Sequence, residues 1–271
     1  MEPIDFEELN RLFGVCKLCL QQKALQDSHF IPRAMYKYLR DPDESKKNRN
    51  PTLVGRKITA TTSKQVTDYV LCTDCEGLFN RNAENWMLQQ VWNGERFPLG
   101  ERLRLAIQHY TFQDFLAFSG RAMGINAEAL GYFTLSVVWR GAVHQWNTPF
   151  GGKTKVLKLG VEEEPIRKFL LGIAPFPTGV AIIATVCTDP YSKGIFYMPS
   201  QTSGIPGTSF AMLTLGVHFM VFTGAPLPPV LHEMCCVRSA HKLIFQRDCS
   251  QKTVEAFAQL MNQRSVHVLG K

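Results

Sequence analysis

The chain has 271 residues, which is too long for an isolated zinc module and sufficient for one large domain or two modest ones. Its 45% hydrophobic and 20% charged residues exclude an intrinsically disordered chain. A net charge of +7 favours a polyanionic partner such as nucleic acid, because a positive field raises the local concentration of phosphates.

No targeting or membrane segment is expected. Residues 1–14 are acidic and predict a short amphipathic helix in place of a signal peptide. The most apolar stretch, 209–224, is interrupted by Thr214, Gly216 and His218, so it predicts two buried strands and no membrane span. We therefore expect a soluble cytoplasmic protein with no membrane partner, in which the eight cysteines stay reduced and paired cysteines indicate metal binding.

The N-terminal third is polar and is divided by turns. A helix-like stretch at 33–39 is followed by a basic loop. Two β-rich runs, 52–59 and 65–71, predict a hairpin that delivers the chain to the second cysteine pair. Apolar side chains then recur along 76–92, which predicts a helix beginning directly after that pair.

The remaining elements divide into a helical and a β-rich part. Apolar periodicity along 101–146 predicts helices, and acidic residues open a short helix at 162–171. A last helix is expected at 250–262. Runs of β-branched and aromatic residues bounded by Pro and Gly predict an antiparallel sheet from 179–188, 194–198, 210–215 and 217–223.

These elements predict an α+β protein with an N-terminal zinc-stabilised ββα-like module, a helical middle and a β-rich C-terminal region. The expected divisions are a zinc module at 1–95, a helical connector at 96–150 and an α+β domain at 151–271. The sequence does not indicate what the last domain does.

Four cysteines have the spacing of a zinc site. Cys16 and Cys19 form one C-x2-C pair, and Cys72 and Cys75 form a second. Each pair can place two sulfurs on one ion, and two pairs complete a tetrahedral four-thiolate site. Zn²⁺ is the expected structural cofactor because it accepts four thiolates without redox chemistry. The alternative is that these are unrelated buried cysteines, which is how we interpret Cys187, Cys235, Cys236 and Cys249.

A second group of polar residues surrounds the two cysteine pairs. Ser28-His29-Phe30-Ile31-Pro32 lies between them, and Glu76, Asn80 and Glu84 follow Cys75 at helical spacing. Oxygen ligands four residues apart can hold Mg²⁺ or Mn²⁺, and a neutral histidine facing the ion can take a proton from water. The ion would stabilise the charge that develops on a phosphate, so these groups suit phosphodiester hydrolysis.

The order of these motifs resembles a known family. CxxC, then His-hydrophobic-Ile-Pro, then Leu-Cys-x-x-Cys with a polar residue opening a helix, is similar to HNH or ββα-metal endonucleases. The closest likeness is to a branch with Ser-His-x-Ile-Pro and Cys-x-x-Cys-Glu, which shares a downstream Leu-Ser-x-x-Trp-Arg element, here residues 135–140. The likeness covers about residues 16–92 and this element.

The resemblance assigns roles to individual residues. His29 matches the general base, Ser28 stands where the family usually has an Asp or His metal ligand, and Glu76 stands where it has His or Asn. Asn80 lies one turn later, where some members place another ligand. Thr67 replaces the usual Asn before the second cysteine pair, and Ser28 is a poor ligand.

Each of these residues also has a purely structural interpretation. His29 could cap a turn, and Glu76, Asn80 and Glu84 could form an ordinary solvated helix face. Trp139 is expected in the core, and Arg140 is expected to pair with a carboxylate or a phosphate.

Three functions are therefore expected to compete. The first is a metal-dependent HNH-like endonuclease that cleaves nucleic acid, with DNA favoured, in phage defence or a mobile element. The second is a non-catalytic zinc module that binds nucleic acid through a basic group at Lys46, Lys47, Arg49, Arg56 and Lys57. The third is a protein-interaction module, with a protein partner bound through the C-terminal domain.

Overall fold

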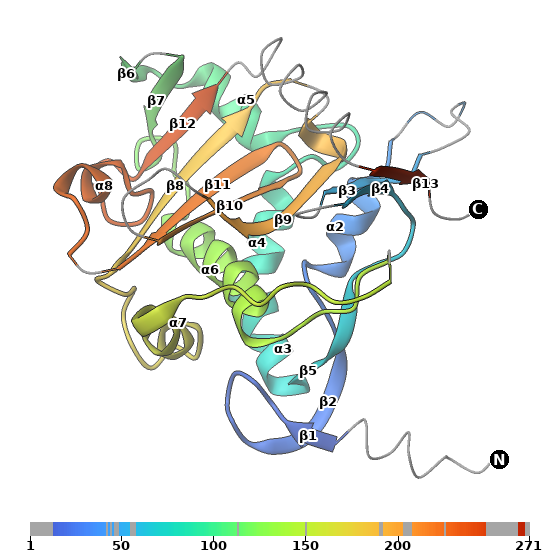
Figure 1. Ribbon diagram of the computed structural model, residues 1–271. Helices are drawn as coiled ribbons and strands as arrows, with labels where there is room; N and C mark the ends of the chain where they lie inside the picture. The colour runs from blue at the N-terminus through green and yellow to red at the C-terminus, as the bar shows by residue number, and fades with distance from the viewer. Residues whose placement is uncertain are drawn as a thin grey trace.

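The computed structural model describes residues 13–41, 43, 45, 49–54, 58–112, 114–149, 151–189, 192–202, 208–224, 226–247 and 265–268. Within them the fold is mixed α+β, with a small sheet, a large sheet and helices packed between and around them (Figure 1). The expected N-terminal and C-terminal helices at 1–14 and 250–262 lie almost entirely outside the described residues.

The small sheet is built from three segments in the order β1-β2-β5. β1 (Phe13–Val15) pairs antiparallel with β2 (Gln22–His29), which pairs antiparallel with β5 (Thr67–Cys72). α3 (Thr73–Phe79) begins where β5 ends and packs against both β2 and β5. Figure 1 shows this unit at the bottom of the view, with the large sheet above it.

The hairpin predicted from 52–59 and 65–71 is wrong in its pairing. β3 (Thr52–Val54) pairs with β4 (Ile58–Thr61) and with β9 (Ile195–Gln201), whereas β5 joins the small sheet through β2. Both runs form β structure, as their composition predicts, but the first contains β3 and the start of β4, which pair with each other. The other partners, β9 for β3 and β2 for β5, lie far away in the sequence, and local β propensity cannot specify them.

The large sheet has its described strands in the order β13-β4-β3-β9-β10-β11-β8-β12-β7-β6. The predicted antiparallel strands are confirmed as β8 (Val180–Cys187), β9, β10 (Thr208–Thr214) and β11 (Val217–Thr223). β12 (Leu243–Arg247) runs parallel to β8, and β13 (Ser265–Val268) runs parallel to β4. The sheet takes strands from all three of the expected divisions, whose boundaries stay a prediction.

The helical middle region is confirmed only in part. α5 (Pro98–Leu105) and α6 (Ala127–Val143) are helices, but 108–119 forms the antiparallel strands β6 (Gln108–Phe112) and β7 (Phe115–Ser119). β7 also pairs with β12, so a partner more than a hundred residues away overrides the apparent helical periodicity.

α6 is the central helix of the molecule. Asn126 caps its N-terminus by accepting a hydrogen bond from Ala129 N at 3.0 Å. Almost all of its side chains are buried, because helices and the large sheet surround it. Trp139 is fully buried, which confirms the core position expected for it. The other α-helices in the described part of the chain are α2 (Arg33–Tyr38), α4 (Asn85–Gln90), α7 (Glu163–Leu170) and α8 (Pro229–Met234).

Candidate metal centre

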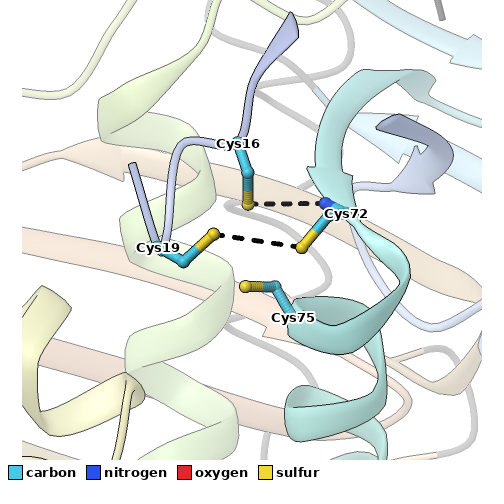
Figure 2. A group of neighbouring side chains, drawn as sticks. All are labelled: Cys16, Cys19, Cys72 and Cys75. Atoms are coloured by element: carbon cyan, nitrogen blue, oxygen red, sulfur yellow. Dashed lines mark hydrogen bonds between the residues drawn. The ribbon is translucent and has the colours of Figure 1, made fainter. Parts of the chain in front are cut away.

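The four paired cysteines converge on one point (Figure 2). Cys16 and Cys19 lie in the loop between β1 and β2, while Cys72 ends β5 and Cys75 lies in the first turn of α3. Their sulfur atoms are all within 4.8 Å of one another, and the Cys19 and Cys72 sulfurs are 4.0 Å apart. A disulfide needs about 2 Å, whereas sulfurs bound to one tetrahedral zinc at about 2.3 Å lie about 3.8 Å apart.

Backbone hydrogen bonds hold the first cysteine pair in place. The Leu20 amide donates to the Cys16 carbonyl at 2.9 Å, and Leu20 has the left-handed φ of 61° that closes this turn. The Lys17 amide donates to the Val70 carbonyl at 3.1 Å, which joins the turn to β5. The Cys72 amide donates to the Cys16 sulfur at 3.4 Å. The two pairs are therefore fixed to each other even though 52 residues separate them in the chain.

The thiols are electrostatically coupled. A hydrogen bond from the Cys75 thiol lowers the pKa of Cys16, and the same shared proton raises the pKa of Cys75. Burial raises the pKa of Cys19. A divalent cation would replace protons shared in this way. Among the described residues, these four form the one group of three or more His, Cys, Asp or Glu side chains that could hold a metal ion such as zinc.

Three of the other four cysteines are placed as expected. Cys187, Cys235 and Cys236 are buried, as expected for small hydrophobic residues. Cys249 lies outside the described residues.

The motif histidine lies at the end of β2. His29 is half-buried, and its ring centroid is 6.3 Å from that of Tyr36. Ser28 beside it is buried, and its hydroxyl accepts a hydrogen bond from the Leu71 amide at 3.1 Å. Ser28 thus has a structural contact within the β2–β5 pair in addition to the ligand role that the resemblance implies.

The acidic residues after Cys75 surround a buried arginine. Arg140 of α6 is 1% exposed, and its Nη2 lies 2.8 Å from Glu84 Oε1 and 3.9 Å from Glu76 Oε2. Its guanidinium also lies 4.5 Å from the centroid of the Phe79 ring. The expected pairing of Arg140 with a carboxylate is thereby confirmed.

The alternative that Glu76, Asn80 and Glu84 form one ordinary solvated helix face is wrong. Asn80 is exposed, whereas Glu84 is buried against α6. The segment Asn80–Glu84 is a π-helix, whose wider turn changes the angular position of Glu84 from the one it would have in an α-helix. The sequence contains no signal for this change of helical phase.

The proposed basic group is described at one position. Arg49 Nε donates to the Asp41 carbonyl at 2.7 Å. Lys46, Lys47, Arg56 and Lys57 lie outside the described residues, so the group as a whole stays a prediction.

Sequence reasoning missed a further polar cluster. His144 Nε2 at the end of α6 lies 2.9 Å from Asp68 Oδ2 on β5, and Asn147 Nδ2 donates to the same oxygen at 3.0 Å. His144 and Asp68 are 76 positions apart. Only the polar Asp68 within a β-rich run could have drawn attention to this position.

Comparisons of the chain with protein-family models, with curated proteins and with solved structures found no match. Over the part of the chain that the structure describes, no helix has both the length and the apolar character needed to cross a membrane.

Proposed function

We propose that this protein is a metal-dependent HNH-like endonuclease that hydrolyses phosphodiester bonds of nucleic acid, with DNA favoured. One observation carries the proposal: β2 and β5 pair antiparallel, α3 packs on both, and four cysteines gather where they meet. The motif resemblance implies this arrangement, in which two paired strands and a helix are joined at a four-cysteine metal site. Phage defence or a mobile element is the biological setting that this family suggests.

The roles follow from the positions of the residues. His29, at the end of β2, would take a proton from the attacking water. Glu76 and Asn80 would hold Mg²⁺ or Mn²⁺, which when bound stabilises the charge on the phosphate and the leaving oxygen. The side chain of Glu76 fits this role in one respect. Its Oε1 is buried and has no hydrogen-bond partner among the described residues, which leaves a carboxylate oxygen for a cation.

The test is cleavage of plasmid DNA, single-stranded DNA and RNA with Mg²⁺, Mn²⁺ or chelator. His29→Ala should lower the rate by about two to four orders of magnitude, the usual contribution of a positioned base. Its zinc content should be unchanged, because four cysteines complete the zinc site without it. Glu76→Ala should also lose cleavage, and excess Mn²⁺ should restore part of it. Ser28→Asp introduces the family's usual ligand and should keep or raise activity.

A non-catalytic zinc module is the second candidate, and two observations favour it. Glu76 lies beside Arg140, and the hydroxyl of Ser28 is already hydrogen-bonded to Leu71. Under this alternative the wild type binds nucleic acid but leaves it intact under every metal condition. Ser28→Asp is then inactive as well. Binding to protein alone, with none to nucleic acid, would identify an interaction module.

A further inference from the structure

Three charged side chains meet where α6 packs against α3 and the π-helical segment. Arg140 comes from α6, Glu84 from the π-helical segment and Glu76 from α3. The side chain of Arg140 is 1% exposed, that of Glu84 is 10% exposed and that of Glu76 is 27% exposed. Glu76 is therefore the member of this group that an ion can reach from solvent.

The two carboxylates share the guanidinium unequally. Nη2 of Arg140 is 2.8 Å from Glu84 Oε1, which is a charge-assisted hydrogen bond. The same nitrogen is 3.9 Å from Glu76 Oε2, which is beyond hydrogen-bond range. The ring of Phe79 lies 4.5 Å from the guanidinium carbon. Glu84 is thus the residue that holds the arginine.

Unused hydrogen-bonding groups remain on both sides of the longer contact. Nε and Nη1 of Arg140 and Oε1 of Glu76 are buried and have no hydrogen-bond partner among the described residues. Such groups are costly to bury, so donors and an acceptor in one cluster should pair unless something prevents it. The hydrogen bond from Arg140 to Glu84 is the contact that holds the guanidinium away from Glu76.

The charges of the cluster favour a cation at Glu76. Two carboxylates and one guanidinium leave one negative charge in excess, and a divalent ion with oxygen ligands can balance it. Asn80 offers an amide oxygen one turn after Glu76. The Asn80 amide donates to the Glu76 carbonyl, so the two residues keep α-helical spacing and lie on one face. Glu84, in the π-helical segment, is buried against α6.

We propose that Glu84 is a positioning residue for the divalent cation: it binds Arg140 and so keeps the carboxylate of Glu76 free for Mg²⁺ or Mn²⁺. This inference rests on the proposed function, which makes Glu76 a metal ligand. A guanidinium that closed on Glu76 would occupy both carboxylate oxygens, because arginine and carboxylate pair in a bidentate manner. Arg140 and the ion therefore compete for Glu76, and Glu84 decides the competition.

The experiment measures Mn²⁺ binding to the zinc-loaded full-length protein without nucleic acid, from the electron paramagnetic resonance signal of free Mn²⁺. Glu84→Gln keeps the shape of the side chain but removes its charge. Among the described residues, Glu76 is then the one carboxylate left to Arg140. The Kd for Mn²⁺ should rise by about tenfold or more, and the Mn²⁺ concentration for half-maximal DNA cleavage should rise with it.

A double variant separates positioning from a loss of folding. Arg140→Met with Glu84→Gln removes both the competitor and the residue that holds it, so the Kd should return to within about threefold of wild type. Glu84→Asp, whose carboxylate reaches less far toward Arg140, replaces Glu84→Gln if that variant fails to fold, and it should show a smaller loss with the same recovery. Zinc content and melting temperature establish that each variant is folded.

Two controls define the site that is measured. Glu76→Ala should lose Mn²⁺ binding, because it removes the proposed ligand. Arg96→Met with Glu101→Gln removes an exposed arginine–glutamate pair, and it should bind Mn²⁺ as wild type does.

The outcomes separate the two proposals. Wild type that binds no Mn²⁺, or binding that Glu76→Ala leaves unchanged, overturns the proposed metal site and the role of Glu84 together. Binding through Glu76 that Glu84→Gln leaves unchanged overturns the role of Glu84 alone. A loss that the double variant does not recover also overturns that role, since Glu84 would then act on the ion and not through Arg140. Loss and recovery in a protein that leaves every nucleic acid intact support the role of Glu84 and overturn the nuclease.

Discussion

At the scale of single residues, the four cysteines are the best-determined feature of this protein. Their spacing predicts a metal site, and the structure brings all four sulfurs within 4.8 Å of one another. His29, Glu76 and Asn80 are described by the structure, and their roles are proposals. Their roles rest on the motif resemblance and on the free carboxylate oxygen of Glu76.

Removing one thiolate should release the metal. We expect about one zinc per chain in wild type, and its loss in Cys72→Ser, because three thiolates bind the ion far less tightly. The melting temperature should fall as well, since metal-binding free energy contributes to folding. Elemental analysis and thermal unfolding measure both effects. Cys187→Ala is the control, because Cys187 is buried outside the cluster. A Cys72→Ser protein with unchanged zinc content would contradict the assignment of the site.

At the scale of secondary-structure elements, one ion pair joins the helix after the zinc cluster to the central helix. Arg140 of α6 contacts Glu84 in the π-helical segment and Glu76 in α3. The guanidinium Nε and Nη1 are buried and have no hydrogen-bond partner among the described residues. The contacts with Glu84 and Glu76 therefore leave two nitrogens of the guanidinium without hydrogen bonds. Removal of the Arg140 side chain should leave both carboxylates without a counter-charge.

Arg140→Met should be strongly destabilising. Loss of one partner of a buried ion pair costs about 3–5 kcal/mol, because the remaining charge stays buried. Addition of Glu84→Gln should recover part of this loss, since it removes that charge. Urea unfolding measures the free energies. Arg96→Met is the control, because Arg96 and Glu101 form an exposed pair that contributes little to stability. Equal losses of unfolding free energy in Arg140→Met and Arg96→Met would contradict this prediction, because they would show that burial does not set the cost of losing the arginine.

His218 on β11 should make the free energy of unfolding depend on pH. Burial, with a smaller contribution from the Arg247 guanidinium, lowers the pKa of His218 to about 4. The pKa of a histidine in an unfolded chain is about 6.5. Between about pH 4 and this value, the unfolded state therefore binds more protons than the folded state. Stability should therefore fall as the pH drops from 7 to 5, and this residue should account for about 1–2 kcal/mol of the loss.

The pH dependence is measured by urea unfolding of wild type and His218→Gln at pH 7, 6 and 5. The variant should lose less stability on acidification than wild type. Parallel curves for wild type and His218→Gln would contradict a neutral His218 in the folded protein.

At the scale of the whole molecule, the net charge of +7 bears on partners and not on the fold. Affinity for a fluorescent DNA duplex should fall steeply between about 50 and 200 mM salt, because bound phosphates release counterions. Lys46→Glu with Lys47→Glu should weaken binding and reduce the salt slope. Lys168→Glu is the control, because Lys168 lies near Glu164 on α7. Fluorescence anisotropy measures each constant. No binding at low salt would reject both nucleic-acid functions and leave the interaction module.

The sequence by itself determined the features that depend on local pattern. The C-x2-C spacing specified the metal cluster, because two sulfurs three residues apart reach one ion in a short turn. The local pattern also specified two sets of elements. Runs of β-branched residues predict β8 to β11, and the apolar periodicity of 127–143 predicts α6, because each of these buried elements consists of consecutive, mostly apolar residues.

Only the tertiary structure decided the features that depend on distant partners. The pairing of β5 with β2, the pairing of β7 with β12, and the contact between Asp68 and His144 all join segments that are far apart in the sequence and carry no local signal of their contact. The π-helical segment belongs with them, because packing against α6 turns Glu84 inward to Arg140. Local propensities are weak compared with the free energy of burying a large sheet around one central helix, so packing determined the final arrangement.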